Sequence, residues 1–355
     1  MTPVELSRTV LRAVRRAVDG GELGAAVVPE RAVVTVPGPG GRGDYATNVA
    51  LRLARPAGRP PLQVAEILRA HLVRADGITD VSVTGPGFLN FRVADGGTRA
   101  LVEEVLRSGS RYGHAAPRDG GPVRLSAPHE VRALVVLGVV AELLRSQGAA
   151  DVRTGCAAEP DPAWSGVLGV RVDDVGPAAG PPGVSPVPAP GDPVPLGRDA
   201  GRWALLRPPA HDVPRLGPEH LAQREANPLF RVRYAHARVR AATRNAADLG
   251  FTAHPADLPA DTPAPAAAAA AATVTLLADH PRVLAGAAAH RAPDRVARQL
   301  VSVADAVTAF LPAVLPVGGE KPSAAHRARL ALAEAAGTVL AGGLDLLGID
   351  APDHL

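Results

Sequence analysis

The 355-residue chain is long enough for two or three domains, and its 46% apolar content supplies material for hydrophobic cores. Its formal charge of +3 is modest. The lone Cys156 excludes an intrachain disulfide framework and a thiolate metal site. The longest apolar runs, residues 133–144 and 266–272 with their flanks, fall short of the roughly 20 residues of a membrane span. No basic-then-apolar leader begins the sequence, so we expect a soluble cytoplasmic protein without a membrane partner.

Arginine supplies almost all of the positive charge, because Lys321 is the single lysine of the chain. The planar, multidentate guanidinium group suits phosphates and stacks on bases, which is compatible with a nucleic-acid partner. Base-composition bias in the source genome is the alternative explanation. Under either explanation, the chain has almost no ammonium group for its chemistry.

Residues 1–97 have the pattern of a small α+β domain. Apolar residues at helical spacing predict a helix over residues 4–18. A β-branched run predicts a strand over 31–36, and residues 45–54 and 63–73 are expected to be helices. Two further strands, expected over 81–84 and 88–93, are separated by a Gly-Pro-Gly turn.

Residues 98–156 have the pattern of the beginning of a parallel α/β unit. A helix over 98–108 is followed by a strand over 123–126, a long apolar helix from about 130 to 145 and a second strand that starts at Val152. Residues 157–198 are rich in Pro, Gly and Ala, and this composition predicts a flexible, partly polyproline-like linker.

Residues 199–355 are expected to be all helical. The predicted helices form a bundle of four or five members, with a break over residues 255–265. They follow a lead-in segment over 199–206 and cover residues 227–249, 267–278, 283–290, 294–311 and 326–347.

The start of this helical region carries a specific motif. Residues 227–238 read Asn-Pro-Leu-Phe-Arg-Val-Arg-Tyr-Ala-His-Ala-Arg, and residues 292–298 read Ala-Pro-Asp-Arg-Val-Ala-Arg. Together with the tail at 343–352, these segments resemble, in order, the DALR-type anticodon-binding helical domain of arginyl-tRNA synthetases. The resemblance implies an all-α domain that contacts a tRNA.

The resemblance also implies roles for single residues. Tyr234 and Arg238 would lie near the anticodon loop, and Arg231, Arg233 and Arg240 would meet phosphates. Family members often end in methionine where this chain ends in Leu355, which joins the anticodon-binding set. The alternative is a solvated basic helix face with Tyr234 half-buried in the bundle.

The N-terminal domain resembles the same family. Residues 43–51 read Gly-Asp-Tyr-Ala-Thr-Asn-Val-Ala-Leu, which is similar to a family helix start, and residues 85–91 read Gly-Pro-Gly-Phe-Leu-Asn-Phe, which is similar to a strand that faces the tRNA elbow. By this resemblance Phe88 would stack on a D-loop base and Asn90 would hydrogen-bond its edge. Alternatively, Phe88 is a core residue and Asn90 caps a turn. Asp44 can also be interpreted as a helix cap.

The nucleotide-binding turn expected of the family is degenerate. Residues 126–132 read Ser-Ala-Pro-His-Glu-Val-Arg, with one histidine, His129, where the family has a His-x-Gly-His-like pair. The glycine is missing, and Glu130 adds a negative charge where a triphosphate would lie, which raises the cost of binding ATP. No catalytic role is assigned to His129, and no ATP cofactor is expected.

The mobile lysine loop of the family has no counterpart with lysines, because Lys321 lies far away in the helical domain. Residues 193–198, with Arg198, are either its eroded remnant or the segment just after it. Residues 123–198 are also too few for a full doubly wound catalytic fold. The middle of the chain is therefore expected to be a shrunken α/β remnant of a class I synthetase Rossmann domain.

These observations predict a multidomain α+β protein whose N-terminal α+β tRNA-binding domain and C-terminal all-α bundle flank that remnant. The favoured function is a non-catalytic arginyl-tRNA synthetase paralogue that binds tRNA, with arginine tRNA as one candidate. One alternative is a protein-interaction module that docks a synthetase or another partner. The other is a residual arginine–tRNA ligase. Scattered histidines predict no metal site.

Overall fold

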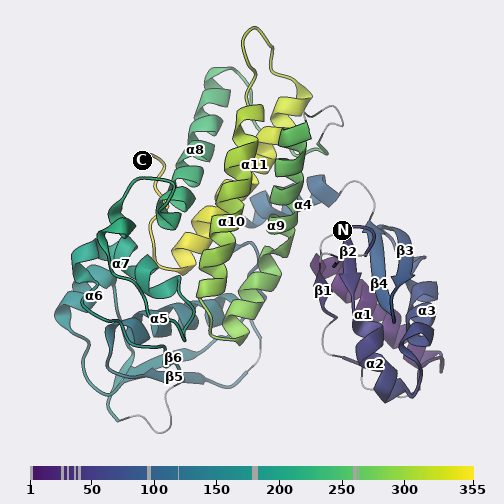
Figure 1. Ribbon diagram of the computed structural model, residues 1–355, viewed down its shortest axis with the longest axis horizontal. Helices are drawn as coiled ribbons and strands as arrows, with labels where there is room; N and C mark the ends of the chain where they lie inside the picture. Colours follow the sequence, from purple (N-terminus) through teal and green to yellow (C-terminus); the bar gives the residue numbers. More distant parts are fainter. Residues whose placement is uncertain are drawn as a thin grey trace. The chain divides into compact units, whose positions relative to one another are not determined.

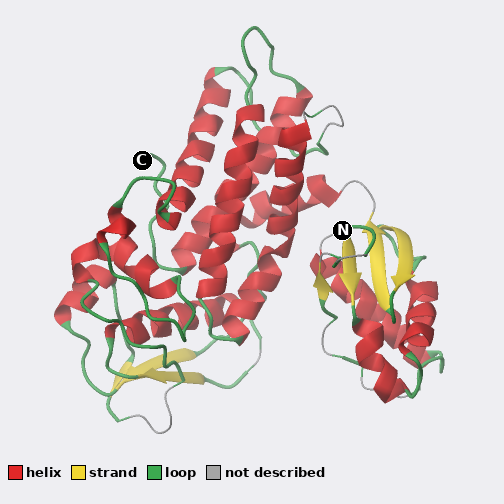
Figure 2. Ribbon diagram, in the orientation of Figure 1, coloured by secondary structure: helices red, strands yellow, loops and turns green. Residues whose placement is uncertain are grey.

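The computed structural model describes residues 3–24, 28–29, 32–35, 37–38, 41–93, 97–118, 120–177, 183–258, 262 and 264–355. The chain divides into two compact units, Met1–Leu101 and Val102–Leu355. The first is a small α+β unit, and the second joins a short parallel sheet to a helical bundle (Figures 1 and 2). The predicted multidomain α+β class is confirmed.

The first unit places helices against an antiparallel sheet with strand order β1-β2-β4-β3. Its elements are α1 (Pro3–Asp19), β1 (Val34–Thr35), β2 (Tyr45–Thr47), α2 (Val49–Ala57), α3 (Pro61–Leu72), β3 (Ile78–Thr84), β4 (Phe88–Val93) and the start of α4 (Gly97–Ser108). The strand expected over 31–36 is β1, although positions 31 and 36 lie outside the described residues.

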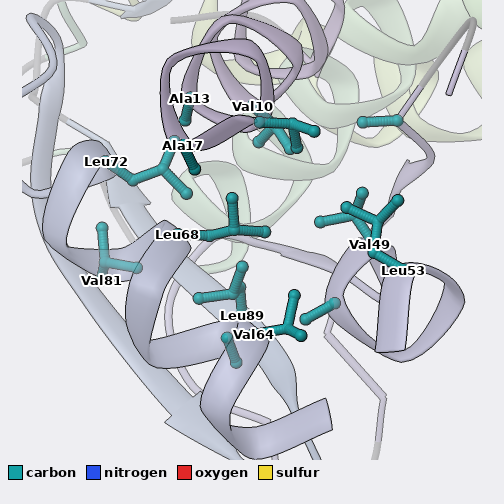
Figure 3. Close-up of a cluster of buried hydrophobic side chains, with 14 of the residues drawn as sticks. Val10, Ala13, Ala17, Val49, Leu53, Val64, Leu68, Leu72, Val81 and Leu89 are labelled. Carbon is teal, nitrogen blue, oxygen red and sulfur yellow. The ribbon is translucent and has the colours of Figure 1, made fainter. Parts of the chain in front are cut away.

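The core of this unit lies between its helices and the sheet (Figure 3). Val10 and Ala17 of α1, Leu68 and Leu72 of α3, and Leu89 of β4 are all buried there. The buried residues of α1 and α3 recur every three or four positions, so one face of each helix points at the sheet. This burial fixes the direction of β4, whose first residue is a candidate site residue.

The helix expected over residues 45–54 is wrong at its start. Tyr45–Thr47 forms β2, and the helix begins only after Asn48. Thr47 donates a hydrogen bond from Oγ1 to the carbonyl of Val33 (2.6 Å), so its β-branched side chain serves the sheet. Asp44 does not cap a helix; its carboxylate accepts a hydrogen bond from the backbone amide of Val93 (2.9 Å).

The second unit begins with a three-stranded parallel sheet in the order β5-β6-β7. Its elements are η1 (Gly109–Arg111), β5 (Val123–Ala127), α5 (Val131–Ser146), β6 (Val152–Cys156), α6 (Pro162–Leu168), β7 (Asp174–Val175) and η2 (Val194–Leu196). Helix α5 connects β5 to β6, as the α/β interpretation predicted, and the sheet is much smaller than a full nucleotide-binding fold.

The prediction of a flexible linker over residues 157–198 is wrong for the part of that range that the structure describes. Asp161 caps α6 by accepting a hydrogen bond from the amide of Ala163 (2.7 Å), and β7 follows. Leu168, Val170 and Val184 are buried. Proline and glycine suppress periodicity in this segment, but its backbone groups find hydrogen-bond partners elsewhere in the unit.

The helical bundle completes the second unit (Figure 1). Its elements are α7 (Gly197–Leu206), η3 (Pro218–Leu221), α8 (Pro228–Asp248), α9 (Ala264–Ala289), α10 (Asp294–Phe310), η4 (Leu311–Ala313) and α11 (Ala324–Leu346). Helices α8, α9, α10 and α11 pack side by side, mostly through Ala, Val and Leu side chains. The expected C-terminal all-α bundle is confirmed.

The two helices expected over 267–278 and 283–290 are one continuous helix, α9, with Pro281 inside it. A proline removes one backbone donor and leaves the carbonyl four residues earlier without its helical partner. Here that carbonyl belongs to Leu277, and the hydroxyl of Tyr112 donates to it (3.1 Å). A side chain distant in sequence therefore restores the bond that the local pattern predicts to be lost.

One segment of the described residues, Asp294–Ala313, is long and apolar enough to span a membrane. It covers α10, and half of it is buried within the protein. Its buried face includes Val296, Leu300, Val303 and Val307, at the spacing of a helix in the core of a bundle.

Candidate nucleic-acid interface

Helix α8 begins at a well-defined cap. Asn227 accepts a hydrogen bond from the amide of Leu229 (3.1 Å), and its side-chain amide donates to the carbonyls of His220 and Ala222 (2.8 and 2.9 Å). Pro228 occupies the first helical position, where its missing N–H costs nothing. The Asn-Pro pair therefore fixes where the helix starts and ties that start to the preceding loop.

Three side chains one turn apart form a ladder along α8. The rings of Phe230 and Tyr234 stack with centroids 5.4 Å apart. Arg238 donates a hydrogen bond to the Tyr234 hydroxyl (2.9 Å), and its guanidinium carbon lies 5.6 Å from the ring centroid. We call these three residues the α8 ladder. It presents partly exposed aromatic faces next to a cation, the combination on which unpaired bases stack.

The structure thus brings Tyr234 and Arg238 together, as the resemblance implied, and adds Phe230. Phe230 belongs to the motif at residues 227–238, but the family resemblance implied no role for it. Its signal is the spacing, because an aromatic residue four positions before Tyr234 must lie on the same face of a helix.

Arg231 and Arg233 of α8 each lie beside a carboxylate. The distances are 3.4 Å from Arg231 to Asp305 of α10 and 3.4 Å from Arg233 to Asp199 of α7. Surface pairs of this kind contribute at most about 1 kcal/mol. A phosphate can compete for either arginine.

An open cleft of about 310 Å³ lies beside the start of α8. Phe230 and Arg233 line one side, Arg198 and Asp199 of α7 another, and Leu355 closes it from the chain end. We call this the α8 cleft. It brings three of the predicted site residues together, Arg198, Arg233 and Leu355.

The chain end reaches the α8 cleft because α8 holds the preceding residues. Nδ1 of His236 lies 3.0 Å from the carbonyl oxygen of Pro352, and Arg240 pairs with Asp353 at 3.0 Å. Burial lowers the pKa of His236, opposed by its hydrogen bond to the Pro352 carbonyl, so the ring stays neutral near pH 7. The position of Leu355 is therefore built into the fold.

The N-terminal candidate residues lie at one end of the β3–β4 hairpin. Phe88 is 40% exposed, whereas Asn90 is 2% exposed. The side-chain amide of Asn90 donates to Oγ1 of Thr84 (2.7 Å) and weakly to the carbonyl of Phe88 (3.4 Å). Phe88 is thus available for stacking, while Asn90 stabilises the turn that presents it, which favours the alternative interpretation of Asn90.

His129 lies just after the carboxyl end of β5. Its Nε2 atom lies 2.8 Å from the carbonyl oxygen of Glu159, and its ring lies 5.3 Å from that of Trp164. Arg198 lies elsewhere, with its Nε donating to the carbonyl of Gly348 (3.3 Å) and its side chain in the α8 cleft. The residues that line this cleft do not include His129.

Glu130 caps the N-terminus of α5 with its own carboxylate. It accepts hydrogen bonds from the amides of Arg132 and Ala133 (3.1 and 2.8 Å), and a third from the amide of Ala189 (3.0 Å). The N-terminus of the helix that follows a first parallel strand is a favourable phosphate position, because its amides and dipole attract anions. In this chain a protein carboxylate uses those amides.

Residues 183–189, which we call the strap, run next to this helix start. The amide of Val184 donates to the carbonyl of Ser126 at the end of β5 (3.1 Å), and Ala189 bonds Glu130. The strap thereby lies against the carboxyl edge of the small sheet, where open α/β sheets bind their ligands.

Arg132 holds the strap and the loop after α7. Its side chain is fully buried, and burial lowers its pKa, although a guanidinium group still stays charged. Its three nitrogens donate to backbone carbonyls at 2.6–3.0 Å. The acceptors are Val187, Leu205, Pro208, Pro209 and Asp212. Sequence reasoning missed this role, which depends on contacts 55–80 positions away.

Among the described residues, no group of three or more His, Cys, Asp and Glu side chains is arranged to hold a metal ion. The expectation of no metal site stays a prediction.

Two family models match this chain, one in its N-terminal part and one in its C-terminal part. The arginyl tRNA synthetase N terminal domain matches residues 5–93, and the DALR anticodon binding domain matches residues 232–355. The arginine–tRNA ligase of Frankia alni is 43% identical over 125 residues, 35% of this chain and 22% of its own length. That of Renibacterium salmoninarum is 39% identical over 167 residues, 42% of this chain and 29% of its own length. The matches thus span less than a third of these relatives.

Solved structures share the fold. Thermus thermophilus arginyl-tRNA synthetase matches with a TM-score of 0.69 at 15% identity, covering 100% of both chains. The Plasmodium falciparum arginyl-tRNA synthetase matches with a TM-score of 0.67 at 8% identity, covering 99% of each chain. These structures show the fold, and the two domain matches tie both ends of the chain to arginyl-tRNA synthetases. The chain is an arginyl-tRNA synthetase-like protein that joins that family's N-terminal and DALR anticodon-binding domains through a shortened catalytic domain.

Proposed function

We propose that this protein is a non-catalytic arginyl-tRNA synthetase paralogue that binds tRNA through its anticodon-binding and N-terminal domains. The observation that carries the proposal is a contrast between two helix starts. Helix α8 exposes the α8 ladder beside an open cleft, whereas the start of α5, the position suited to a phosphate, is filled by Glu130.

The tRNA-binding half rests on the α8 ladder and the α8 cleft. Stacking of one base on an aromatic side chain is worth about 1–3 kcal/mol. The rings of Phe230 and Tyr234 offer such a platform, and Arg238 places positive charge at its end. Arg198 and Arg233 line the adjacent cleft, where they suit phosphate oxygens, and Leu355 adds an apolar wall for a base.

The N-terminal domain adds a second contact in this proposal. Phe88 stacks on a base of the D-loop, and Asn90 positions the turn that carries it. The preferred tRNA is arginine tRNA, the substrate class named by the relatives, and the protein acts in the cytoplasm.

The non-catalytic half rests on the middle of the chain. A triphosphate at the start of α5 would have to displace the Glu130 carboxylate from three amides and would be repelled by its charge. The strap occupies the neighbouring edge of the sheet. We therefore assign no catalytic residue and no ATP cofactor.

A second candidate, a residual arginine–tRNA ligase, is favoured by the names of the relatives. It requires ATP to bind where Glu130 caps α5, and arginine-dependent ATP–pyrophosphate exchange separates it from the first.

Fluorescence anisotropy with labelled arginine tRNA tests the proposal. If at least two phosphates are contacted, affinity falls by about tenfold or more between 50 and 200 mM salt. Tyr234→Ala should weaken binding about 5- to 150-fold, the equivalent of 1–3 kcal/mol of stacking. Arg238→Ala should also weaken binding, and its matched control is Arg282→Ala, which removes another paired surface arginine of the same unit, on α9, and should not. Undetectable or salt-insensitive binding by the unmodified protein would refute the proposal.

A further inference from the structure

The first unit contains a polar cleft that none of the comparisons or the proposed function explains. Its volume is about 500 Å³, and it lies between α1 and the turn that joins α3 to β3. We call it the α1 cleft. Residues that line it include Thr9, Arg12, Arg16, His71, Arg74 and Asp76. We propose that the α1 cleft is a phosphate-binding site.

The arginines of this cleft converge from two elements. Arg12 and Arg16 lie one turn apart on α1, and Arg74 approaches from the turn after α3. Like charges at this helical spacing repel each other, so the arrangement is unfavourable until an anion is bound. The guanidinium fork suits phosphate oxygens, to which it can donate two parallel hydrogen bonds.

The internal contacts of the cleft leave these arginines available. Arg12 donates to Oγ1 of the buried Thr9 (3.0 Å), which orients its side chain along the cleft. Arg16 and Arg74 are both exposed. Within the part of the chain that the structure describes, neither of them pairs with a carboxylate. By contrast, Arg69 nearby on α3 pairs with Glu66 at 2.7 Å.

The acidic residues of the cleft do not cancel this charge. Glu5 and Asp76 line it together with the three arginines, so three positive charges face two negative ones. His71 lies 3.0 Å from Glu22, which holds the imidazole in place at the edge of the cleft.

The α1 cleft is separate from the predicted D-loop contact. In the β3–β4 hairpin, Ile78 pairs with Val93 at one end and Thr84 pairs with Phe88 at the other. The cleft includes Gly77, directly before Ile78. Six residues of strand at about 3.3 Å each separate the two ends by roughly 20 Å. A single phosphate group bound in the α1 cleft therefore does not reach the Phe88 turn.

Phosphate groups come from two sources, the backbone of a bound RNA or a free phosphorylated small molecule. Binding of an RNA phosphate at this cleft rests on the proposed function, whereas binding of a free phosphorylated small molecule does not. The test therefore has a tRNA arm and an inorganic phosphate arm, both with the full chain. The variant is Arg16→Ala with Arg74→Ala. The matched control is Arg8→Ala with Arg15→Ala, which removes two exposed arginines of α1 that do not line the cleft.

In the tRNA arm, each lost phosphate contact reduces the slope of log affinity against log salt by about 0.7–0.9. If the affinities of the variant and the unmodified protein are equal at 1 M salt, the loss of two phosphate contacts lowers the affinity for tRNA roughly 25- to 60-fold at 0.1 M salt. The control variant should keep near-normal affinity and slope. In the phosphate arm, inorganic phosphate at constant ionic strength should raise the Tm of the unmodified protein and of the control, but not that of the cleft variant.

A selective loss in the tRNA arm supports the proposal with RNA as the source. A selective loss in the phosphate arm alone supports it with a small molecule as the source. If the cleft variant matches the control in both arms, the proposal is overturned. Failure of the unmodified protein to bind tRNA refutes the proposed function instead, and the phosphate arm still decides whether the cleft binds phosphate.

Discussion

Replacing Arg132 with methionine tests how the middle of the chain is held together. The buried guanidinium donates five hydrogen bonds to the backbone carbonyls of two segments, the strap and the end of α7 with the loop that follows it. Methionine fills a similar volume but donates nothing. The carbonyl of the buried residue 205 would lose its side-chain donor, while those of the partly or fully exposed residues 187, 208, 209 and 212 can turn to water.

The expected loss follows from this division. A buried acceptor left without a donor costs about 1–3 kcal/mol, and each of the four acceptors that can turn to water loses about 0.5 kcal/mol, the lower end of the net worth of a hydrogen bond, so the total is about 3–5 kcal/mol. A loss of 3–5 kcal/mol is a large part of the 5–15 kcal/mol that stabilises most domains. For a unit the size of Val102–Leu355, it corresponds to a decrease in Tm of roughly 6–20 °C.

Urea and thermal unfolding, followed for each unit, measure this loss. The transition of the second unit should shift, and that of Met1–Leu101 should not. Arg124→Met is the control, because that side chain is largely exposed on β5 and should change stability by less than about 0.5 kcal/mol. A loss below 1 kcal/mol for Arg132→Met would refute the view that Arg132 anchors the strap.

Two further predictions concern stability. Glu130→Ala removes the cap of α5 and should lower the free energy of unfolding in urea by about 1–2 kcal/mol. Glu142→Ala, an exposed change in the same helix, should lower it far less, and equal losses would contradict the capping role. Burial lowers the pKa of His280 to about 4 from 6.5, so between these values the unfolded chain binds the proton and the folded chain does not. The free energy of unfolding should therefore fall by up to about 3 kcal/mol from pH 6.5 to 4, and His280→Gln should flatten that fall; an unchanged pH profile in this variant would contradict the assignment.

Local patterns were sufficient for much of the fold. The apolar spacing of α1, the Gly-Pro-Gly turn before β4 and the Asn-Pro start of α8 are each local signals, and the structure has these elements close to where they were expected. The motif around Tyr234 also led to the α8 ladder, because residues four positions apart on a helix must meet.

The errors occur where distant side chains override local rules. Helix α9 continues through Pro281 because the hydroxyl of Tyr112, far away in sequence, bonds the carbonyl that proline leaves free. The range 157–198 has the composition of a linker, yet Arg132 and Glu130 supply partners for its backbone. No periodicity within the segment encodes those contacts, so a single sequence could not predict them.

The same limit applies to the site. The exposure of Phe88 and the burial of Asn90 depend on how the hairpin turn closes. From the sequence alone, both residues are good candidates for a tRNA contact. Arg198 was placed with His129 from their order in a family motif, whereas its contact with Gly348 brings it to the α8 cleft.

Arginine-dependent ATP–pyrophosphate exchange tests the central claim most directly, on a preparation that binds arginine tRNA in the anisotropy assay. The account predicts no exchange above background, with or without tRNA, because Glu130 occupies the amides that a phosphate would need. Exchange that depends on arginine and exceeds background would contradict it and establish the protein as a ligase.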